Sequence, residues 1–574
     1  MINAVPLLAV RNLSVDFISE NATTSALKDI SFLVNKGEIV ALVGESGSGK
    51  SVTALSILQL VPSPPAAYKN GEIIFSENSD SNIDILKAGS KQLQTIRGNK
   101  IAMIFQEPMT SLNPVLTCGD QVAESILLHK KKSAKEAKQE AINWFEKVKI
   151  PDPAGIFNRY PHQLSGGQKQ RVMIAMAMCC HPSLLICDEP TTALDVTVQK
   201  NILLLIKELQ QQQDMGVIFI THDLGVVAEI ADRAIVMYKG GIVEQNETKK
   251  IFTQPQHPYT KALLACRPAL HNKGERLPVV SDFLNPENKE NLNSKSSNQI
   301  YNEPAITDTN NPLLSVKNLS VQFPSRKNIL GKALQIVKAV DDISFDVFKG
   351  ETVGLVGESG CGKTTLGRAL LRLIEPTSGK IIYNNIDLTA KNRDELKGLR
   401  KELQVVFQDP YSSLNPRLTI GSAIEEPLKV HRLLNTLKAR KEKAIDLLEK
   451  VNMQADHYSR YPHEFSGGQR QRIVIARALA LNPSFVICDE SVSALDVSVQ
   501  AQVLNLLNDL KKDLGFTVIF ISHDLSVVRY ISDRIMVMKS GKIVETGKAD
   551  DVYINPQTEY TKNLVASIPK AILH

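Results

Sequence analysis

GEIVALVGESGSGKS, residues 37–51, joins an apolar run, Ile39 to Val43, to a glycine-rich turn that ends in lysine and serine. Its last eight residues fit the spacing G-x-x-x-x-G-K-[S/T], which is typical of a phosphate-binding loop between a strand and a helix. Consecutive backbone N–H groups in such a loop surround an anion, and the next helix adds its positive N-terminal end. Similar apolar runs at Leu184–Cys187 and Val217–Ile220 alternate with helical patterns such as SVTALSILQLV, which predicts an α/β fold with a buried, largely parallel sheet.

The same stretch recurs as GETVGLVGESGCGKT at residues 350–364. The acidic turn CDEPTTALDVTVQ, from Cys187, recurs as CDESVSALDVSVQ, from Cys488, and other segments recur in the same order. A repeat of about 300 residues indicates two tandem domains, because solenoid units are far shorter. We expect one domain at residues 1–270 and another at residues 312–574. Residues 271–311, rich in Asn, Ser, Glu and Pro, are expected to form a polar disordered linker.

Composition narrows the class of protein. The chain has 574 residues, 43% hydrophobic and 22% charged, and 67 basic against 61 acidic residues leave a net charge of +6. So small an excess does not favour nucleic acid as a partner. Apolar runs such as VMIAMAMCC, residues 172–180, are about half the length that spans a bilayer, so we expect a cytosolic chain. The seven cysteines show no paired spacing and are expected to be buried thiols.

Each glycine-rich loop predicts a site for a nucleoside triphosphate with Mg²⁺. The lysine reaches the outer phosphates, and the final hydroxyl, from Ser51 or Thr364, binds the metal ion. Asp188 and Asp489, which end the apolar runs LLICD and FVICD, are expected to hold Mg²⁺ through water. The predicted loops comprise Gly44, Glu45, Ser46, Gly47, Ser48, Gly49, Lys50 and Ser51 in the first copy, and Gly357, Glu358, Ser359, Gly360, Cys361, Gly362, Lys363 and Thr364 in the second.

Catalytic groups are expected beside these loops. Glu189 and Glu490 follow the metal-binding aspartates and are placed to polarise an attacking water. His222 and His523 follow neighbouring apolar runs, VIFIT and VIFIS. A lone histidine at a strand end is usually a capping or solvated residue. Its recurrence before Asp in both copies favours a contact with the γ-phosphate.

LSGGQ at Leu164–Gln168 and FSGGQ at Phe465–Gln469 add a second anion-binding turn to each copy. With the loops and acidic turns, they make the chain resemble the ATP-binding-cassette family over everything except the linker. The resemblance implies two tandem ATPase domains, each with a mostly parallel core sheet, an antiparallel β subdomain and a helical subdomain. It also implies that the cassettes stack head to tail, so that each signature turn completes the other's site. The signature residues are Ser165, Gly166, Gly167 and Gln168, with Ser466, Gly467, Gly468 and Gln469.

The resemblance assigns six further residues. Phe17 and Phe323 stack on adenine, although Pro324 follows the second phenylalanine, where the first copy has Ile18. The other four form two matched pairs. Gln106 and Gln408 contact Mg²⁺ and the attacking water. Asp195 and Asp496 link the two sites.

YPHQLSGG, QEPMTSLNP and the trailing QHPYTKALLACRP resemble importers of dipeptides, oligopeptides and nickel. Two fused cassettes of this kind resemble the glutathione-importer branch. The resemblance implies ATP and Mg²⁺ as cofactors, two transmembrane permease subunits and an extracytoplasmic solute-binding protein as partners, and a peripheral position on the cytoplasmic face of the bacterial inner membrane. Some relatives bind an iron–sulphur cluster in this extension, but Cys266 is its only cysteine, so none is expected. The solute stays open between peptide, glutathione and nickel, and the resemblance favours peptides.

Two other classes of protein use such cassettes. A tandem-cassette ATPase acting on ribosomes would have a long basic linker, whereas this linker is slightly acidic. A chromosome or DNA-repair ATPase would carry a coiled-coil insertion or zinc modules, which the sequence lacks. Within the transport class, Ser491 replaces Pro190, which changes the freedom of the chain beside Glu490. Since the remaining site residues recur, we expect two competent sites.

Overall fold

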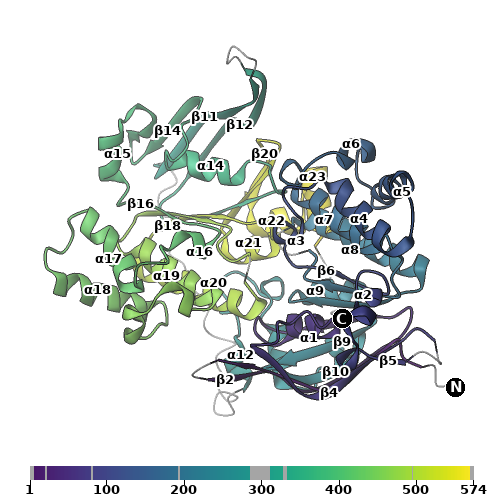
Figure 1. Ribbon diagram of the computed structural model, residues 1–574. Coiled ribbons are helices and arrows are strands. Elements are labelled where there is room, and N and C mark those ends of the chain that lie inside the picture. The colour runs from purple at the N-terminus through teal and green to yellow at the C-terminus, as the bar shows by residue number, and fades with distance from the viewer. Residues whose placement is uncertain are drawn as a thin grey trace. The chain divides into compact units, whose positions relative to one another are not determined.

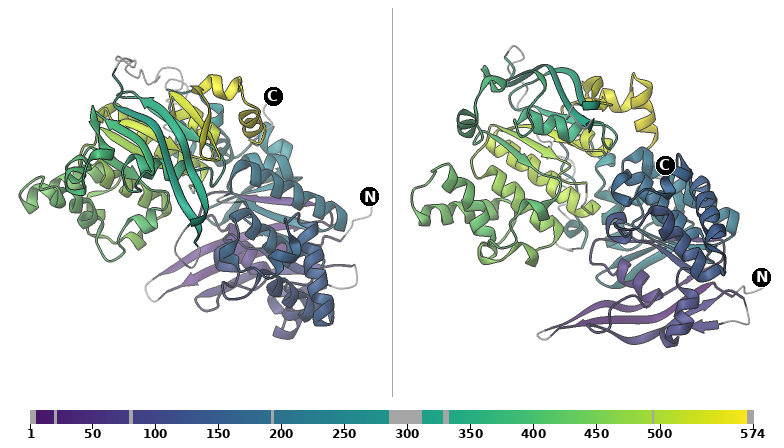
Figure 2. Two further views of the ribbon diagram at one scale, coloured as in Figure 1. Left: turned by 90° about the horizontal axis from the view of Figure 1, so that it is seen from above. Right: turned by 45° about the horizontal axis from the view of Figure 1, so that its top comes forward.

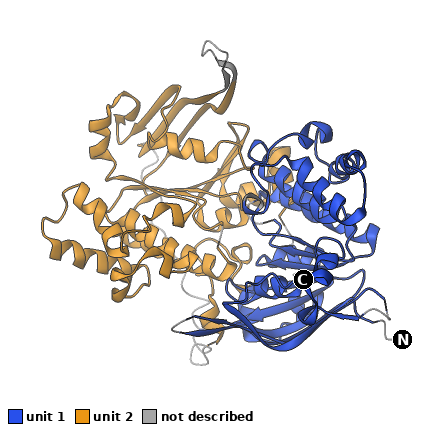
Figure 3. Ribbon diagram, viewed as in Figure 1, with its two compact units in different colours: residues 1–264, 569–574 blue, residues 265–568 orange. Residues whose placement is uncertain are grey.

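The computed structural model of the protein describes residues 5–19, 22–78, 82–191, 194–284, 311–327, 333–493 and 495–568. The chain forms two compact units, unit 1 at residues 1–264 and unit 2 at residues 265–568 (Figure 3). Within the described ranges, no helix is both long and apolar enough to cross a membrane.

Unit 1 is built on a six-stranded sheet with the strand order β10-β9-β3-β8-β7-β6. Figure 1 labels three of its strands, β6, β9 and β10. Neighbouring strands from β9 to β6 are parallel, and β10 is antiparallel to β9. The expected parallel core is thereby confirmed. The strands are β3 (Ile39–Val43), β6 (Ile101–Ile104), β7 (Leu184–Asp188), β8 (Gly216–Thr221), β9 (Arg233–Tyr238) and β10 (Gly241–Glu247).

Both faces of this sheet are buried, which explains why its central strands are almost wholly apolar. All side chains of β3 and β8 are buried. Successive residues of β8 enter two different cores, Val217 and Phe219 on one face and Ile218 and Ile220 on the other.

A four-stranded antiparallel sheet, of order β2-β1-β4-β5, covers one of the two cores. This core also takes Ala54 and Ile57 from the helix that follows the phosphate loop. The sheet is the expected antiparallel subdomain. Its strands are β1 (Leu8–Ile18), β2 (Thr23–Val34), β4 (Ala66–Ser76) and β5 (Asn82–Asp84).

The other core joins the sheet to a helical subdomain, in which α4 packs against α5, α6 and α7. Trp144 and Phe145 of α5 lie fully buried there. Capping side chains define where the helices begin: Thr117 starts α4, and Ser133 forms a capping box with Glu136 of α5. The helices of unit 1 are α1 (Lys50–Ile57), α2 (Ser90–Ile96), α3 (Pro108–Ser111), α4 (Cys118–Lys130), α5 (Ala134–Lys147), α6 (Pro153–Phe157), α7 (Gly166–Met178), α8 (Val196–Gln213), α9 (Leu224–Ile230), α10 (Thr248–Thr253) and α11 (Pro258–Ala265).

Unit 2 repeats this architecture, with sheet orders β16-β17-β18-β13-β19-β20 and β12-β11-β14-β15. Figure 2 shows β11 and β12 as two long paired strands, in teal. The strands are β11 (Leu314–Lys327), β12 (Ala333–Val347), β13 (Thr352–Val356), β14 (Ser378–Tyr383), β15 (Ile386–Asp387), β16 (Leu403–Val406), β17 (Phe485–Asp489), β18 (Thr517–Ile521), β19 (Arg534–Lys539) and β20 (Lys542–Lys548).

The helices of unit 2 follow the same plan, with α17, α18 and α19 packed together as the helical subdomain. They are α12 (Val280–Leu284), α14 (Lys363–Leu370), α15 (Arg393–Leu399), α16 (Pro410–Ser413), α17 (Ile420–Val430), α18 (Leu437–Lys450), α19 (Gly467–Leu479), α20 (Val497–Leu514), α21 (Leu525–Ile531), α22 (Ala549–Ile554) and α23 (Glu559–Ala566).

The start of the expected linker is ordered, which corrects the prediction of disorder from residue 271. Residues 271–284 belong to unit 2, where Leu277 is 1% exposed. The Asn505 side chain accepts a hydrogen bond from the Leu277 N–H (2.9 Å) and donates one to the Leu277 carbonyl (2.8 Å). Tyr530 donates to the carbonyl of Glu275 at 2.6 Å. We call residues 273–280 the strap; residues 285–310 of the expected linker lie outside the described residues.

Candidate functional site

The first phosphate loop lies between β3 and α1, as predicted. Gly44 and Gly49 have φ values of 152° and 104°, which L side chains rarely adopt, and a Cβ on Gly44 would lie 2.2 Å from the Met237 carbonyl oxygen. The buried Lys50 ammonium donates to the carbonyl oxygens of Gly44 (2.7 Å) and Glu45 (2.9 Å). The loop thus curls around its own lysine at the N-terminal end of α1.

The second loop, between β13 and α14, has the same geometry. Gly357 has a φ of 156°, and a Cβ there would meet the Met538 carbonyl oxygen at 2.2 Å. Lys363 donates to the carbonyl oxygens of Gly357 (2.7 Å) and Glu358 (3.0 Å). The two loops are therefore equivalent in backbone and lysine contacts.

The residues predicted to bind Mg²⁺ meet at the end of each loop. Ser51 donates from Oγ to Asp188 Oδ1 at 3.2 Å, and Thr364 from Oγ1 to Asp489 Oδ1 at 3.0 Å. Burial raises the pKa of Asp188 to about 6, and it also raises the pKa of Asp489. A buried carboxylate beside a hydroxyl offers the hard oxygen ligands that Mg²⁺ prefers, so these residues fit the ion.

The predicted catalytic glutamate, glutamine and histidine also meet in each copy. Glu189 Oε2 accepts a hydrogen bond from Gln106 Nε2 at 3.2 Å and lies 3.3 Å from His222 Nδ1. In unit 2, Glu490 Oε2 accepts from Gln408 Nε2 at 2.7 Å and lies 3.5 Å from His523 Nδ1.

The pKa of Glu490 lies below its usual range. Burial alone would raise it, but the hydrogen bond and charge of His523 and the charge of Lys363 outweigh burial. The carboxylate of Glu490 is therefore ionised at neutral pH, the form that can accept a proton from water.

The replacement of Pro190 by Ser491 leaves the adjacent glutamate where it is in the other copy. Glu189 and Glu490 both have a φ of 48°. Their N–H groups donate to the carbonyls of Ile220 (3.0 Å) and Ile521 (2.9 Å), at the ends of β8 and β18. The strand pairing, rather than the proline, holds this position.

The two signature turns start α7 and α19. Ser165 and Ser466 cap these helices, and each forms a capping box with the glutamine three residues later, Gln168 or Gln469. Both turns thus belong to the helical subdomains.

The remaining predicted residues lie on other strands or at the starts of helices. Phe17, on β1, packs beside the apolar core, whereas Phe323, on β11, is 41% exposed. Asp195 caps α8 by accepting from the Val198 N–H at 2.9 Å, and Asp496 precedes α20.

The structure adds two loop contacts that the sequence predictions missed. The Glu45 N–H donates to the Tyr259 hydroxyl at 3.0 Å, and the Glu358 N–H donates to the Tyr560 hydroxyl at 3.2 Å. Each tyrosine belongs to the C-terminal extension of its copy. Their recurrence at matched positions, in HPYT and in TEYT, was the available signal.

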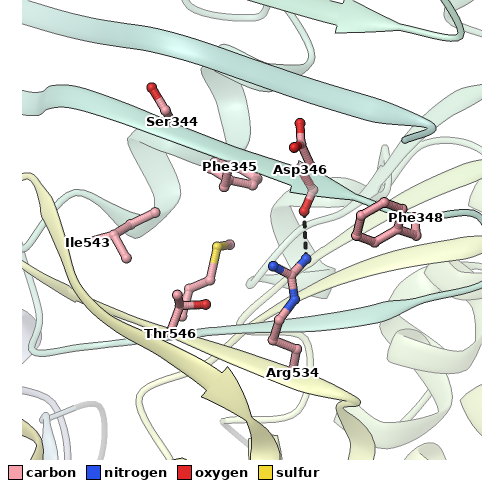
Figure 4. Close-up of a pocket in the computed structure, with 8 residues that line it drawn as sticks. Ser344, Phe345, Asp346, Phe348, Arg534, Ile543 and Thr546 are labelled. Atoms are coloured by element: carbon pink, nitrogen blue, oxygen red, sulfur yellow. Dashed lines mark hydrogen bonds between the residues drawn. The ribbon is translucent and has the colours of Figure 1, made fainter. Parts of the chain in front are cut away.

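A pocket of about 290 Å³ in unit 2 lies apart from these groups, between β12 and the β19–β20 pair (Figure 4). Arg534 donates to the Asp346 carbonyl at 2.6 Å, and its guanidinium also contacts the carboxylate of Glu351 at 2.9 Å. Arg534 thereby ties the antiparallel subdomain to the core sheet, which is a structural role.

Comparison with known proteins places both halves in one family. Residues 27–192 and 340–493 match the family model described as ABC transporter. Residues 243–291 and 544–572 match that described as Oligopeptide/dipeptide transporter, C-terminal region.

Curated relatives match over nearly the whole chain. The glutathione import ATP-binding protein of Escherichia coli (strain K12) is 50% identical over 571 residues, which cover 99% of this chain and 90% of that protein. The protein of the same name from Pectobacterium atrosepticum is 48% identical over 566 residues, 98% of this chain and 90% of that one. A solved dimeric ATP-binding cassette with ADP and phosphate is 30% identical, with a TM-score of 0.38, over 41% of this chain and 98% of that chain.

These matches do not support the ribosome-acting alternative. From the two family-model matches and the two full-length relatives, the chain belongs to the ABC transporter family and is an ATP-hydrolysing subunit with two fused cassettes.

Proposed function

We propose that this chain powers the import of glutathione or other short peptides into a bacterial cell. The observation that carries the proposal is the 50% identity over 99% of the chain to a protein named for glutathione import. The peptide-transporter C-terminal region in both halves supports the same solute class. Nickel, the other solute of the resemblance, is the alternative cargo.

In the proposed mechanism, each loop holds the phosphates of one ATP. Lys50 and Lys363 turn from the loop carbonyls to the β- and γ-phosphates, and the N-terminal ends of α1 and α14 face the same charge. Bound Mg²⁺, held by Ser51 with Asp188 or by Thr364 with Asp489, would neutralise charge on the phosphates. Phe17 and Phe323 stack on adenine, and the signature turns Ser165–Gln168 and Ser466–Gln469 take part in nucleotide binding.

The glutamates perform the proton transfer. Glu189 and Glu490 accept a proton from the attacking water, while Gln106 and Gln408 orient that water and would contact a bound Mg²⁺. His222 and His523 contact the γ-phosphate. The contacts of both imidazoles with the glutamate oxygens support this assignment, because one short network then spans the water and the phosphate.

Family membership implies a membrane permease as partner, and we propose two permease subunits together with an extracytoplasmic solute-binding protein. Motion would pass to the permeases through the segments after Gln106 and Gln408. Exposed apolar side chains in these segments support a protein contact: Val115 is 75% exposed and Tyr411 is 54% exposed. This role places the chain on the cytoplasmic face of the inner membrane.

The decisive experiment measures ATPase activity of the chain with its permease subunits in lipid vesicles that also receive the solute-binding protein. Glutathione, di- and tripeptides and Ni²⁺ are compared as ligands. We expect glutathione or a peptide class to stimulate hydrolysis and to accumulate inside the vesicles. Stimulation by Ni²⁺ alone would contradict the peptide assignment, and no stimulation by any ligand would contradict the importer assignment.

A further inference from the structure

The C-terminal extension of each cassette reaches the phosphate loop through one tyrosine hydroxyl. The tyrosines are Tyr259, at the start of α11, and Tyr560, at the start of α23; their hydroxyls accept the N–H groups of Glu45 and Glu358 at 3.0 and 3.2 Å. We propose that Tyr259 and Tyr560 are positioning residues for nucleotide binding, each holding the second residue of its phosphate loop. The proposal rests on the ATP site proposed above.

The extension helices are themselves fixed to the core sheet, so each tyrosine has a defined place. Glu244 of β10 accepts the backbone N–H groups of Gln256 (2.8 Å) and His257 (3.0 Å), just before α11. Glu545 of β20 accepts those of Gln557 (2.8 Å) and Thr558 (3.0 Å), just before α23.

Both carboxylates are ionised near neutrality. Burial would raise the pKa of Glu244 and that of Glu545, but the hydrogen bonds they accept outweigh it and lower both values. A charged acceptor at the N-terminal end of a helix is a strong anchor.

A second set of hydrogen bonds joins each loop to the turn between the last two strands of its core sheet, β9–β10 or β19–β20. The Gly240 N–H donates to the Ser48 carbonyl at 3.1 Å, and the Gly541 N–H donates to the Cys361 carbonyl at 2.9 Å. The tyrosine holds the beginning of the loop and this turn holds its middle. The loop is therefore supported at two points before nucleotide arrives, which lowers the cost of ordering it on binding.

The tyrosine contact becomes more important when the lysine moves. Lys50 donates to the Glu45 carbonyl at 2.9 Å, so the Glu45 residue has its N–H held by Tyr259 and its C=O held by Lys50. A lysine that turns to the phosphates gives up such a contact. The Glu45 carbonyl then keeps its hydrogen bond from the Ser48 N–H (3.1 Å), while the hydroxyl of Tyr259 holds the Glu45 N–H.

Ring packing alone is the competing explanation. Tyr259 is fully buried, with its ring centroid 4.2 Å from that of Tyr238, and Lys539 lies 4.8 Å above the ring of Tyr560. Phenylalanine keeps the ring and removes only the hydroxyl. The variants Tyr259→Phe and Tyr560→Phe therefore separate the two explanations.

The test uses the full chain with the lysine of one phosphate loop replaced. Only the other site then contributes to the measured nucleotide binding and hydrolysis. Tyr259→Phe is measured with Lys363→Ala, and Tyr560→Phe with Lys50→Ala. Affinity for a fluorescent ATP analogue with Mg²⁺ is measured together with KM and kcat. The matched control is Tyr383→Phe, on the antiparallel sheet of unit 2. Tyr383 is buried, and its hydroxyl donates to Glu402 Oε2 at 3.1 Å.

Each test variant should weaken nucleotide binding about five- to tenfold, because a loop N–H loses its acceptor. KM should rise accordingly with a smaller change in kcat, and faster amide exchange in the loop peptide should accompany it. Tyr383→Phe should bind nucleotide as its parent does. The inference is overturned if both tyrosine variants bind within twofold of their parents. If a chain with both Lys50→Ala and Lys363→Ala still bound nucleotide normally, the proposed ATP site itself would be wrong.

Discussion

The side-chain amide of Gln408 donates to Oε2 of Glu490 at 2.7 Å, and Gln106 makes the same contact with Glu189 at 3.2 Å. The glutamine that starts the segment toward the helical subdomain therefore touches the proposed general base. A shift of that segment would move the base, which gives a direct route from subdomain position to hydrolysis.

Replacing the general base should block turnover at either site. We expect Glu189→Gln and Glu490→Gln each to lower steady-state ATPase activity severely, because the water is no longer polarised. The double variant should lose activity by about 100-fold or more. The measurement is phosphate release at saturating ATP. Nucleotide affinity, the control, should stay within a few-fold of the parent. Unchanged turnover in Glu490→Gln would show that the second site is regulatory.

The raised pKa of Asp188 predicts a pH-dependent affinity for MgATP at the first site. The carboxylate must be ionised to hold Mg²⁺, and below its pKa of about 6 protons compete with the metal. Affinity should therefore fall as the pH drops from about 7 to about 5, by up to about tenfold per unit below the pKa. Titrations in a chain with Lys363→Ala would isolate the first site. The same titrations with Asp188→Asn added should show only the protonation of ATP itself, so an equally steep curve would contradict the prediction.

The matching backbone at Glu189 and Glu490 predicts that the residue after the glutamate is interchangeable. Ser491→Pro should change the ATPase rate of the second site less than about twofold, because the φ of 48° at Glu490 already equals that at Glu189. Pro190→Ser should behave likewise at the first site. Rates are compared in chains in which the other site carries the glutamine variant. A large change in either would show that the side chain at this position, rather than the strand pairing, sets the geometry.

The strap should contribute measurably to the stability of unit 2. Asn505 is 2% exposed and bonds both backbone groups of Leu277, so Asn505→Ala leaves two buried groups unpaired. We expect a loss of about 2–3 kcal/mol in the free energy of unfolding, read as a lower denaturant midpoint for unit 2. Asn563→Ala, at an exposed position of α23 in unit 2, is the control and should cost under about 0.5 kcal/mol. Equal midpoints for both variants would mean that the strap contact carries no stability.

Much of the site could be predicted because its residues are sequence neighbours of strands. The loops, Asp188 and His222 all follow apolar runs, and a parallel sheet brings the ends of such runs to one edge. Tyr259 could not be found this way, because it lies 214 residues from Glu45 and acts through a single hydroxyl. Its recurrence as Tyr560 marks the position, but the sequence does not indicate its partner in the loop.

The ordered strap shows a different limit. Residues 271–311 are polar on average, and the average hides Leu277 and Val280, which are 1% and 7% exposed. The two copies differ at the position that contacts the strap: Asn505 stands where the first copy has Leu204, which is 51% exposed. A buried amide in place of a leucine indicates a backbone partner, which composition cannot reveal.

The strap also determines at which residue the chain can be cut into two separately expressed halves. The peptide-transporter region of the first half extends to residue 291, yet its described residues from Ala265 to Leu284 fold as part of unit 2. A second half expressed from residue 312 would leave Asn505 and Tyr530 without the strap, while the first half would expose Leu277 and Val280 to water. Separate halves cut at the apparent boundary should therefore be less soluble than the intact chain, whereas a cut after Leu264 would leave the strap with the helices it packs against.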